Sequence, residues 1–254
     1  MKKYIEYKPT GISWIPFIPI EWHMVKINEL FVERKEKVSD KDFPPLSVTK
    51  FGVLPQLDTA VKTKDGENRK KVCAGDFVIN SRSDRRGSSG ISPLDGSVSL
   101  INIVLKPRKG ISYYYHYLLR SHKFIEEFYH NGRGIVADLW TTRYSEMRNI
   151  LVPYPSHEEQ NAIVAYLNWQ KSVFNNIIPE KAITKGNLIA SSKSLLAREI
   201  MLIDEYRTRL FSDVVTGQID VRGIEIPEYE FEEENVDVEN DESMEEMEGG
   251  TYEE

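Results

Sequence analysis

Hydrophobic and polar residues alternate in short runs through the first 157 residues, and glycines and prolines separate these runs. Alternation with a period of two is typical of half-buried strands, and Gly or Pro between runs is typical of turns. The expected strands lie at 43–56 (two strands around a turn at Phe51-Gly52), 72–83, 97–108 and 149–155. This part of the chain is therefore predicted to be rich in strands.

Two further patterns interrupt the strands. Pro16 and Pro19 in the opening segment predict an extended edge, and residues 27–31 fit one helical turn. Between 111 and 132, apolar residues recur at helical spacing, at Tyr114, Tyr117, Leu118, Ile125 and Phe128. We expect these side chains in the core, and stacking on a nucleic-acid base is the alternative.

A change to helical spacing follows residue 156. Ser156 and Glu159 form an S-x-x-E capping box in front of an apolar pattern that reaches Pro179. A second helix is expected from Gly186 to about Val215, a rod of roughly 40 Å at ~1.5 Å per residue. The apolar positions expected to pack helices or bind a partner are Ile163, Leu167, Phe174, Ile189, Leu196, Ile200, Ile203, Leu210 and Val214.

These patterns predict an α+β fold, in which a mixed α/β domain over 1–156 precedes a coiled-coil-like helical spacer over 157–217. Residues 218–254 are expected to form an exit strand and a tail that is disordered beyond about Ile226. The wide apolar stripe, to which Leu188, Leu195 and Leu202 add a second row, suggests a helical hairpin that also binds a second subunit. A hairpin without any partner is the alternative.

Charge divides the chain into two parts. The net charge is −7, but residues 223–254 hold 15 acidic and no basic residues, so the first 222 residues hold 25 acidic and 33 basic residues, a net of +8. A basic body favours a phosphate-bearing partner, although a merely soluble surface is possible. The acidic tail promotes solubility or imitates DNA against the basic body.

Motifs for catalysis are scarce. The sequence has no phosphate-binding glycine loop, and its five histidines show no metal-ligand spacing, so no catalytic, cofactor-binding or metal residue is expected. Glu33-Arg34-Lys35 resembles a nuclease pattern that often arises by chance. Cys73 is the only cysteine, and no apolar run could span a membrane, so we expect a cytoplasmic protein with a structural thiol and no membrane partner.

Three segments rich in hydrogen-bond donors could contact DNA. Arg can bond guanine through a bidentate fork, Asn can read adenine, and Ser or Gly can reach phosphates. The alternative for each segment is a solvated loop. The candidate DNA-binding residues are Thr49 and Lys50 in the first segment; Asn80, Ser81, Arg82, Arg85, Arg86, Ser88 and Ser89 in the second; and Arg133, Thr141, Thr142 and Arg143 in the third.

Several phrases resemble those of specificity subunits of type I restriction–modification systems. The two most specific are ILVPYPSHEEQNAIVAYL at 150–167, similar to the passage from a recognition domain into its spacer helix, and EYRTRLFSDVVTGQIDVR at 205–222, similar to the family's ending. Similar phrases also occur at 11–31, 33–37, 43–56, 75–80 and 95–108. The resemblance covers about residues 11–222.

The resemblance implies a non-catalytic protein that binds double-stranded DNA and holds methyltransferase and motor–nuclease subunits. Cofactors would then belong to those partners: S-adenosylmethionine to the methyltransferase, and ATP and Mg to the motor–nuclease. Family members usually carry two recognition domains, whereas this chain has one, which implies a half-subunit that homodimerises through its helices. The stretch 175–186 and the acidic tail depart from the family pattern. The rival readings are a decoy subunit that binds methyltransferase without DNA, and a stand-alone DNA-modifying enzyme.

Overall fold

A computed structural model describes residues 2–56, 66–108, 113–134, 140–177 and 190–229, and the side chains of 177 and 190–197 are not included. Two compact units are built from stretches that are not consecutive. Unit 1 contains 1–25, 111–127 and 151–233, and unit 2 contains 26–110, 128–150 and 234–254. The predictions for Leu188 and Ile189, for the side chains of Leu195 and Leu196, and for the tail from residue 230 fall outside the described residues.

Unit 2 is built on three antiparallel sheets. The largest has the strand order β10-β9-β12-β4, the second has the order β11-β8-β5, and β6 pairs with β7 as a hairpin. The strands are β4 (Phe31–Glu33), β5 (Lys37–Val38), β6 (Leu46–Thr49), β7 (Gly52–Pro55), β8 (Arg69–Val72), β9 (Phe77–Asn80), β10 (Ser89–Ile91), β11 (Gly96–Val98) and β12 (Asn102–Pro107). The short helices α1 (Ile27–Leu30) and α4 (Tyr144–Met147) complete the unit.

One hydrophobic core joins the three sheets of unit 2. Leu46 and Val53 from the hairpin pack with valines of the two larger sheets, namely Val72, Val78, Val98 and Val104. The strand after Gly75-Asp76 is as predicted, and the hairpin forms, but its turn is Lys50-Phe51 and Gly52 is already the first residue of β7. The single strand predicted over 97–108 is wrong, because the chain turns between Ser99 and Asn102, whose N–H donates to the Ser99 carbonyl at 3.0 Å. The turn is necessary since β11 pairs with β8 whereas β12 pairs with β9.

Unit 1 combines small sheets with long helices. The strands β1 (Tyr7–Pro9) and β2 (Phe17–Pro19) pair with each other, and β13 (Leu151–Tyr154) pairs with β3 (His23–Lys26). The helix predicted over 111–132 is instead α2 (Tyr114–Arg120) followed by α3 (His122–His130), which continues into unit 2. Ser121 breaks it, because its backbone is extended (ψ 145°) and its hydroxyl donates to the Leu118 carbonyl at 2.7 Å.

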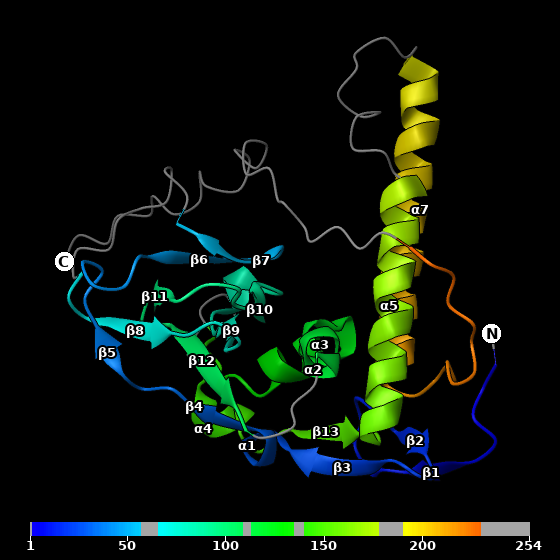
Figure 1. Cartoon of the computed structure of the whole chain (residues 1–254), viewed down its shortest axis with the longest axis horizontal. Coiled ribbons are helices and arrows are strands. Elements are labelled where there is room, and N and C mark those ends of the chain that lie inside the picture. The colour runs from blue at the N-terminus through cyan, green and yellow to red at the C-terminus, as the bar shows by residue number, and fades with distance from the viewer. Residues whose placement is uncertain (1, 57–65, 109–112, 135–139, 178–189, 230–254) are drawn as a thin grey trace. The chain divides into compact units, whose positions relative to one another are not determined.

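Two long helices, α5 (His157–Ile177) and α7 (Ala190–Val215), lie side by side and antiparallel in unit 1 (Figure 1). Phe174 of α5 contacts the rings of Tyr206 and Phe211 on α7. Five of the predicted apolar positions are buried: Ile163, Leu167, Phe174, Leu210 and Val214. Ile200 and Ile203 are half-buried, whereas Met201 and Leu202 are 60% and 52% exposed. The predicted apolar positions of α7 are therefore buried near its end, at Leu210 and Val214, and half-buried at Ile200 and Ile203, beside the exposed Met201 and Leu202.

The opening residues belong with the helix pair, not with the strands of unit 2, so the boundary expected at residue 156 does not separate the two units. Gly217 explains part of this arrangement. Its φ is +73°, and a Cβ at this position would lie 2.5 Å from Pro19 Cδ and 3.0 Å from Trp22. The turn at the end of α7 thus fits closely against the opening segment only because residue 217 is glycine.

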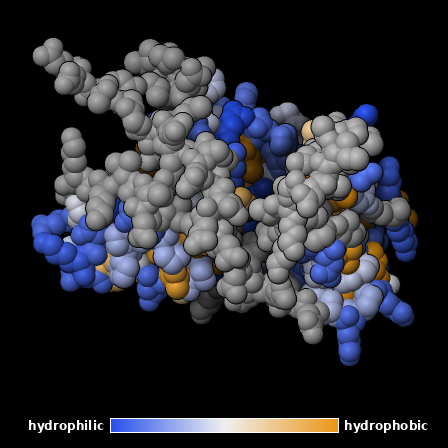
Figure 2. Space-filling view, turned by 90° about the horizontal axis from the view of Figure 1, so that it is seen from above, coloured by the Kyte–Doolittle hydropathy of each residue, from blue (hydrophilic) through white to orange (hydrophobic). Residues whose placement is uncertain are grey.

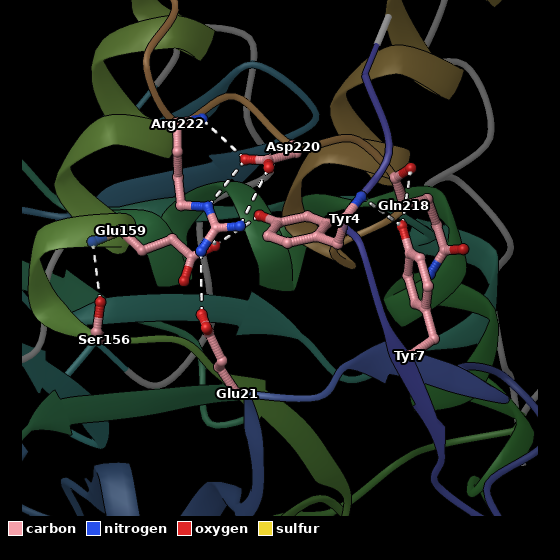
Figure 3. A network of polar contacts seen from close by, with 8 residues as sticks. All are labelled: Tyr4, Tyr7, Glu21, Ser156, Glu159, Gln218, Asp220 and Arg222. Carbon is pink, nitrogen blue, oxygen red and sulfur yellow. Dashed lines mark hydrogen bonds and ion pairs between the residues drawn. The ribbon is translucent and has the colours of Figure 1, made fainter.

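A polar network fixes the start of α5 to both the opening and the exit segments (Figure 3). The Tyr4 hydroxyl donates to Glu159 at 2.6 Å, and the Arg222 guanidinium contacts Glu21 at 3.0 Å and Asp220 at 3.0 and 3.1 Å. Burial by itself would raise the pKa of Asp220, but the hydrogen bonds from Arg222 bring it below its ordinary value. The network therefore holds a carboxylate that is charged at neutral pH.

The same network changes the predicted capping box. The Glu159 N–H donates to the Ser156 hydroxyl at 3.2 Å, as predicted. The Glu159 carboxylate instead accepts from Tyr4 and lies 3.9 Å from Arg222. Only half of the capping box is thus confirmed, because a tertiary contact uses the carboxylate.

Replacing Tyr4 by phenylalanine is expected to lower the free energy of unfolding by about 1–3 kcal/mol, because the change leaves the 5%-exposed Glu159 without its buried donor. Urea titration followed by circular dichroism measures the loss. Tyr7→Phe is the comparison variant, since the Tyr7 hydroxyl makes only longer bonds to backbone groups: it accepts the Tyr4 N–H at 3.3 Å and donates to the Gln218 carbonyl at 3.5 Å. Equal stability of Tyr4→Phe and wild type would contradict the assignment of a stabilising role to this hydrogen bond.

Candidate nucleic-acid interface

The second donor-rich segment, 80–90, is an ordered connection between β9 and β10 that contains a short 3₁₀ helix (Ser83–Arg85). The Asn80 N–H donates to the Ser88 carbonyl at 2.9 Å, and the Ser88 N–H donates to the Arg85 carbonyl at 3.1 Å. Tyr129 supports the loop, because its hydroxyl donates to the Asn80 carbonyl at 2.8 Å. Burial raises the pKa of Tyr129, so this hydroxyl keeps its proton.

The third segment lies directly against the second, which sequence spacing does not predict. The Ser83 N–H donates to the Trp140 carbonyl at 2.9 Å, and the Thr142 N–H donates to the Ser81 carbonyl at 3.0 Å. Arg133 and Thr141 form a small bridge of their own, with reciprocal backbone bonds of 3.1 and 3.2 Å. The two segments thus form one surface of unit 2.

The first segment, at the β6–β7 turn, also approaches this surface. A Cβ added at Gly90 of β10 would lie 3.1 Å from the Cα of Gly52, so the hairpin and β10 pack backbone to backbone. Strand β10 follows the Arg85-Arg86 loop directly. All three segments predicted to contact DNA are therefore neighbours in unit 2, although about 90 residues separate the first from the last.

Exposed positive charge is provided by five of the predicted residues: Lys50, Arg82, Arg86, Arg133 and Arg143. They differ in their local partners. The Arg82 guanidinium donates to the Asp84 carboxylate from Nε at 3.0 Å and from Nη2 at 2.8 Å, which neutralises its charge locally. Arg86 lies over the ring of Tyr129, 5.3 Å from its centroid, which orients the guanidinium. The Arg133 side chain is 84% exposed, and its Nε lies 3.8 Å from the Glu146 carboxylate, which is a longer contact than that of Arg82 with Asp84.

Most of the serine and threonine residues that were predicted to contact DNA are buried inside the protein. Ser81, Ser88, Ser89 and Thr142 are buried. Thr142 donates to the Phe128 carbonyl at 2.9 Å, and Ser81 donates to the Ile101 carbonyl. In this conformation they shape the loops, and their hydroxyls have no path to a base.

The remaining predicted residues are partly accessible. Asn80, Arg85 and Thr141 are half-buried, and the Asn80 Oδ1 accepts the Arg82 N–H at 3.1 Å. Thr49 is also half-buried and uses its hydroxyl within the β6–β7 turn, where it donates to the Gly52 carbonyl at 3.1 Å.

Two residues of this surface were not predicted from the sequence. Helical spacing places Tyr129 in a helix and gives it no role in the loop, and the turn pattern gives Phe51 no role beyond the turn. Phe51 is 52% exposed beside Lys50. A large aromatic residue inside a two-residue turn was the available signal, because turns normally carry small or polar residues.

The described residues include no group of three or more His, Cys, Asp or Glu that could hold a metal ion. The nuclease-like Glu33 and Lys35 lie 3.5 Å apart as an ion pair, and Lys70 lies 3.5 Å from the same carboxylate. No described helix is long and apolar enough to cross a membrane.

No family model and no curated protein matches this sequence. Among solved structures, the chain is similar to one from a study of assembly and conformational transition of the type I R-M system, with 16% identity over 84% of this chain and 49% of the other, and a TM-score of 0.42. Two others are an HsdS subunit from Thermoanaerobacter tengcongensis (16% identity, 84% and 47% coverage, TM-score 0.43) and a type I restriction-modification S subunit from M. genitalium (20% identity, 75% and 46% coverage, TM-score 0.42). The chain thus spans about half the length of each, and TM-scores below 0.5 do not by themselves establish a shared fold.

Proposed function

We propose that the chain is the DNA-recognition subunit of a type I restriction–modification complex, in a half-size form with one recognition module. The observation that carries the proposal is the convergence of three cationic, donor-rich segments on one surface of unit 2. The resemblance of residues 11–222 to type I specificity subunits, described above, also supports the proposal.

Recognition would divide between two kinds of contact. Exposed cations such as Lys50, Arg133 and Arg143 bind phosphates and fix the register on the duplex. Arg86, oriented by Tyr129, bonds a guanine in the major groove. Half-buried Arg85 and Asn80 are the further candidates for base contacts.

The helix pair would provide the connections to partners. Two copies associate through the exposed apolar positions of α7, Met201 and Leu202, and read a bipartite palindromic site. Methyltransferase subunits, which bring S-adenosylmethionine, flip the target adenine, and motor–nuclease subunits bring ATP and Mg. The chain itself contributes recognition and no catalysis.

A second candidate function is a decoy subunit that binds methyltransferase without DNA. The 15 acidic residues of 223–254 favour it, because a polyanion on the same chain could compete with phosphate for the basic residues. A chain truncated after Arg222 keeps the polar network of Figure 3 and separates the two functions. DNA binding by the full chain supports recognition, whereas binding by the truncated chain alone supports the decoy.

The experiment is selection from a random duplex library of 40 base pairs, followed by fluorescence anisotropy with the enriched and scrambled duplexes. We expect the enriched duplex to bind at least ~1000-fold more tightly than the scrambled one at physiological salt. Absence of enrichment with both the full and the truncated chain would contradict DNA recognition. Turnover by the chain alone with DNA, Mg²⁺ and S-adenosylmethionine would instead identify an enzyme.

A further inference from the structure

The tip of the β6–β7 hairpin presents an aromatic ring to solvent. Thr49 and Gly52 are paired in the hairpin register, so Lys50 and Phe51 form a two-residue turn. Phe51 is 52% exposed, whereas Leu46 and Val53 of the same hairpin are buried in the core. The ring is therefore carried on a support that is anchored in unit 2.

The turn is held in one conformation. The Thr49 Oγ1 accepts the Phe51 N–H at 3.1 Å and donates to the Gly52 carbonyl at 3.1 Å. Gly52 has a φ of +130°, which L side chains rarely adopt. A turn whose backbone is fixed in this way loses little backbone entropy when its aromatic residue binds.

A single exposed apolar residue is ordinary on a protein surface and needs no explanation by itself. Where Figure 2 colours the surface, hydrophobic residues appear as separate patches among hydrophilic ones. Phe51 differs from such residues in its neighbours, because it adjoins Lys50 and the hairpin packs on β10, directly after the Arg85-Arg86 loop. The ring thus lies on the same surface as cations able to hold a phosphate backbone.

A phenyl ring has no hydrogen-bonding group, so it cannot read the donors and acceptors of a base edge. Apolar side chains that DNA-binding proteins bring close to the bases contact a thymine methyl group, insert as wedges at a base step, or stack on a base that has left the helix. We propose that Phe51 is a wedge that partly unstacks one base step of the duplex, an inference that rests on the proposed DNA-recognition function. The cations around the hairpin hold the backbone while the ring enters the stack.

The test uses the full chain and the 40-base-pair duplex enriched by selection, with 2-aminopurine placed at one step at a time. Wild type is expected to raise the fluorescence at one or two adjacent steps and to leave the others unchanged. Phe51→Ala should abolish this rise and weaken binding by roughly 5- to 100-fold, the range that stacking contributes. Phe51→Trp should retain both the rise and the affinity.

Phe17→Ala is the matched control, because Phe17 is 51% exposed on β2 of unit 1, outside the candidate interface. It should change neither signal. Tight binding by wild type without a fluorescence rise at any step, or an unchanged rise with Phe51→Ala, overturns the wedge and leaves the recognition function intact. A loss of affinity with Phe51→Ala but no unstacking in wild type identifies a surface contact, such as one with a thymine methyl group, and also overturns it. Failure of wild type to bind any duplex overturns both proposals.

Discussion

Replacing Arg86 by alanine is expected to weaken binding to the selected duplex by about 1–3 kcal/mol, roughly 5- to 150-fold, with little change for scrambled DNA. The reason is the geometry of the side chain, which is exposed and oriented over the ring of Tyr129. A planar guanidinium held in this way can present two parallel donors to guanine O6 and N7. Anisotropy titrations with both duplexes measure the two affinities.

Arg82→Ala is the matched control in the same loop. Its guanidinium is bonded to Asp84 at 2.8 and 3.0 Å, so its removal should have a much smaller effect on either duplex. Equal losses of affinity on the selected and scrambled duplexes with Arg86→Ala would mark a phosphate contact in place of base reading. Arg85→Ala, made in parallel, tests the half-buried neighbour.

Replacing Leu202 by aspartate is expected to dissociate the proposed dimer, with a dimer dissociation constant raised by roughly 100-fold, because a symmetric interface suffers each change twice. Leu202 is 52% exposed on α7 beside Met201, which is 60% exposed, so the substitution disturbs little of the packing within one chain. Light scattering over a range of concentrations measures the change of mass. Thermal unfolding of the variant at low concentration shows whether the monomer remains folded.

Arg209→Ala serves as the control on the same helix. Its side chain is 83% exposed and lies 3.7 Å from Asp213, so it should leave the dimer unchanged. A wild-type chain that is monomeric at micromolar concentration, or a Leu202→Asp variant that remains dimeric, would show that α7 does not hold two copies together.

Local sequence patterns predict many of the helices and strands. The hairpin around Phe51-Gly52, the edge strand β13 and the start of α5 follow from alternation, proline and capping signals that act over a few residues. The predictions of one strand through Ser99–Asn102 and of one helix through Ser121 were wrong for a different reason. A strand pattern does not reveal that its two halves pair with different sheets, and a helix pattern does not reveal a serine that bonds its own backbone.

The candidate site was predictable in residue type and not in arrangement. Side-chain chemistry pointed to the arginines of 82–86 and to Arg133 and Arg143. Which cations already have partners depends on side-chain contacts such as Arg82 with Asp84. The burial of Ser89 and Thr142 depends on the tertiary fold, which no local pattern encodes. The same holds for the contacts between the two segments, Ser83 with Trp140 and Thr142 with Ser81, which are far apart in sequence.

The polar network at the start of α5 also sets an order for events on the ribosome. Its bonds join residues far apart in sequence, 155 residues for Tyr4 with Glu159 and 201 for Phe17 with Gln218, so unit 1 stays incomplete until Arg222 has emerged. The described stretches of unit 2 all lie between residues 26 and 150, so they leave the exit tunnel before unit 1 is complete. At 5–20 residues per second, roughly 10 to 40 s pass between the synthesis of the opening segment and that of Arg222, and during this time the opening segment lacks its partners in the network.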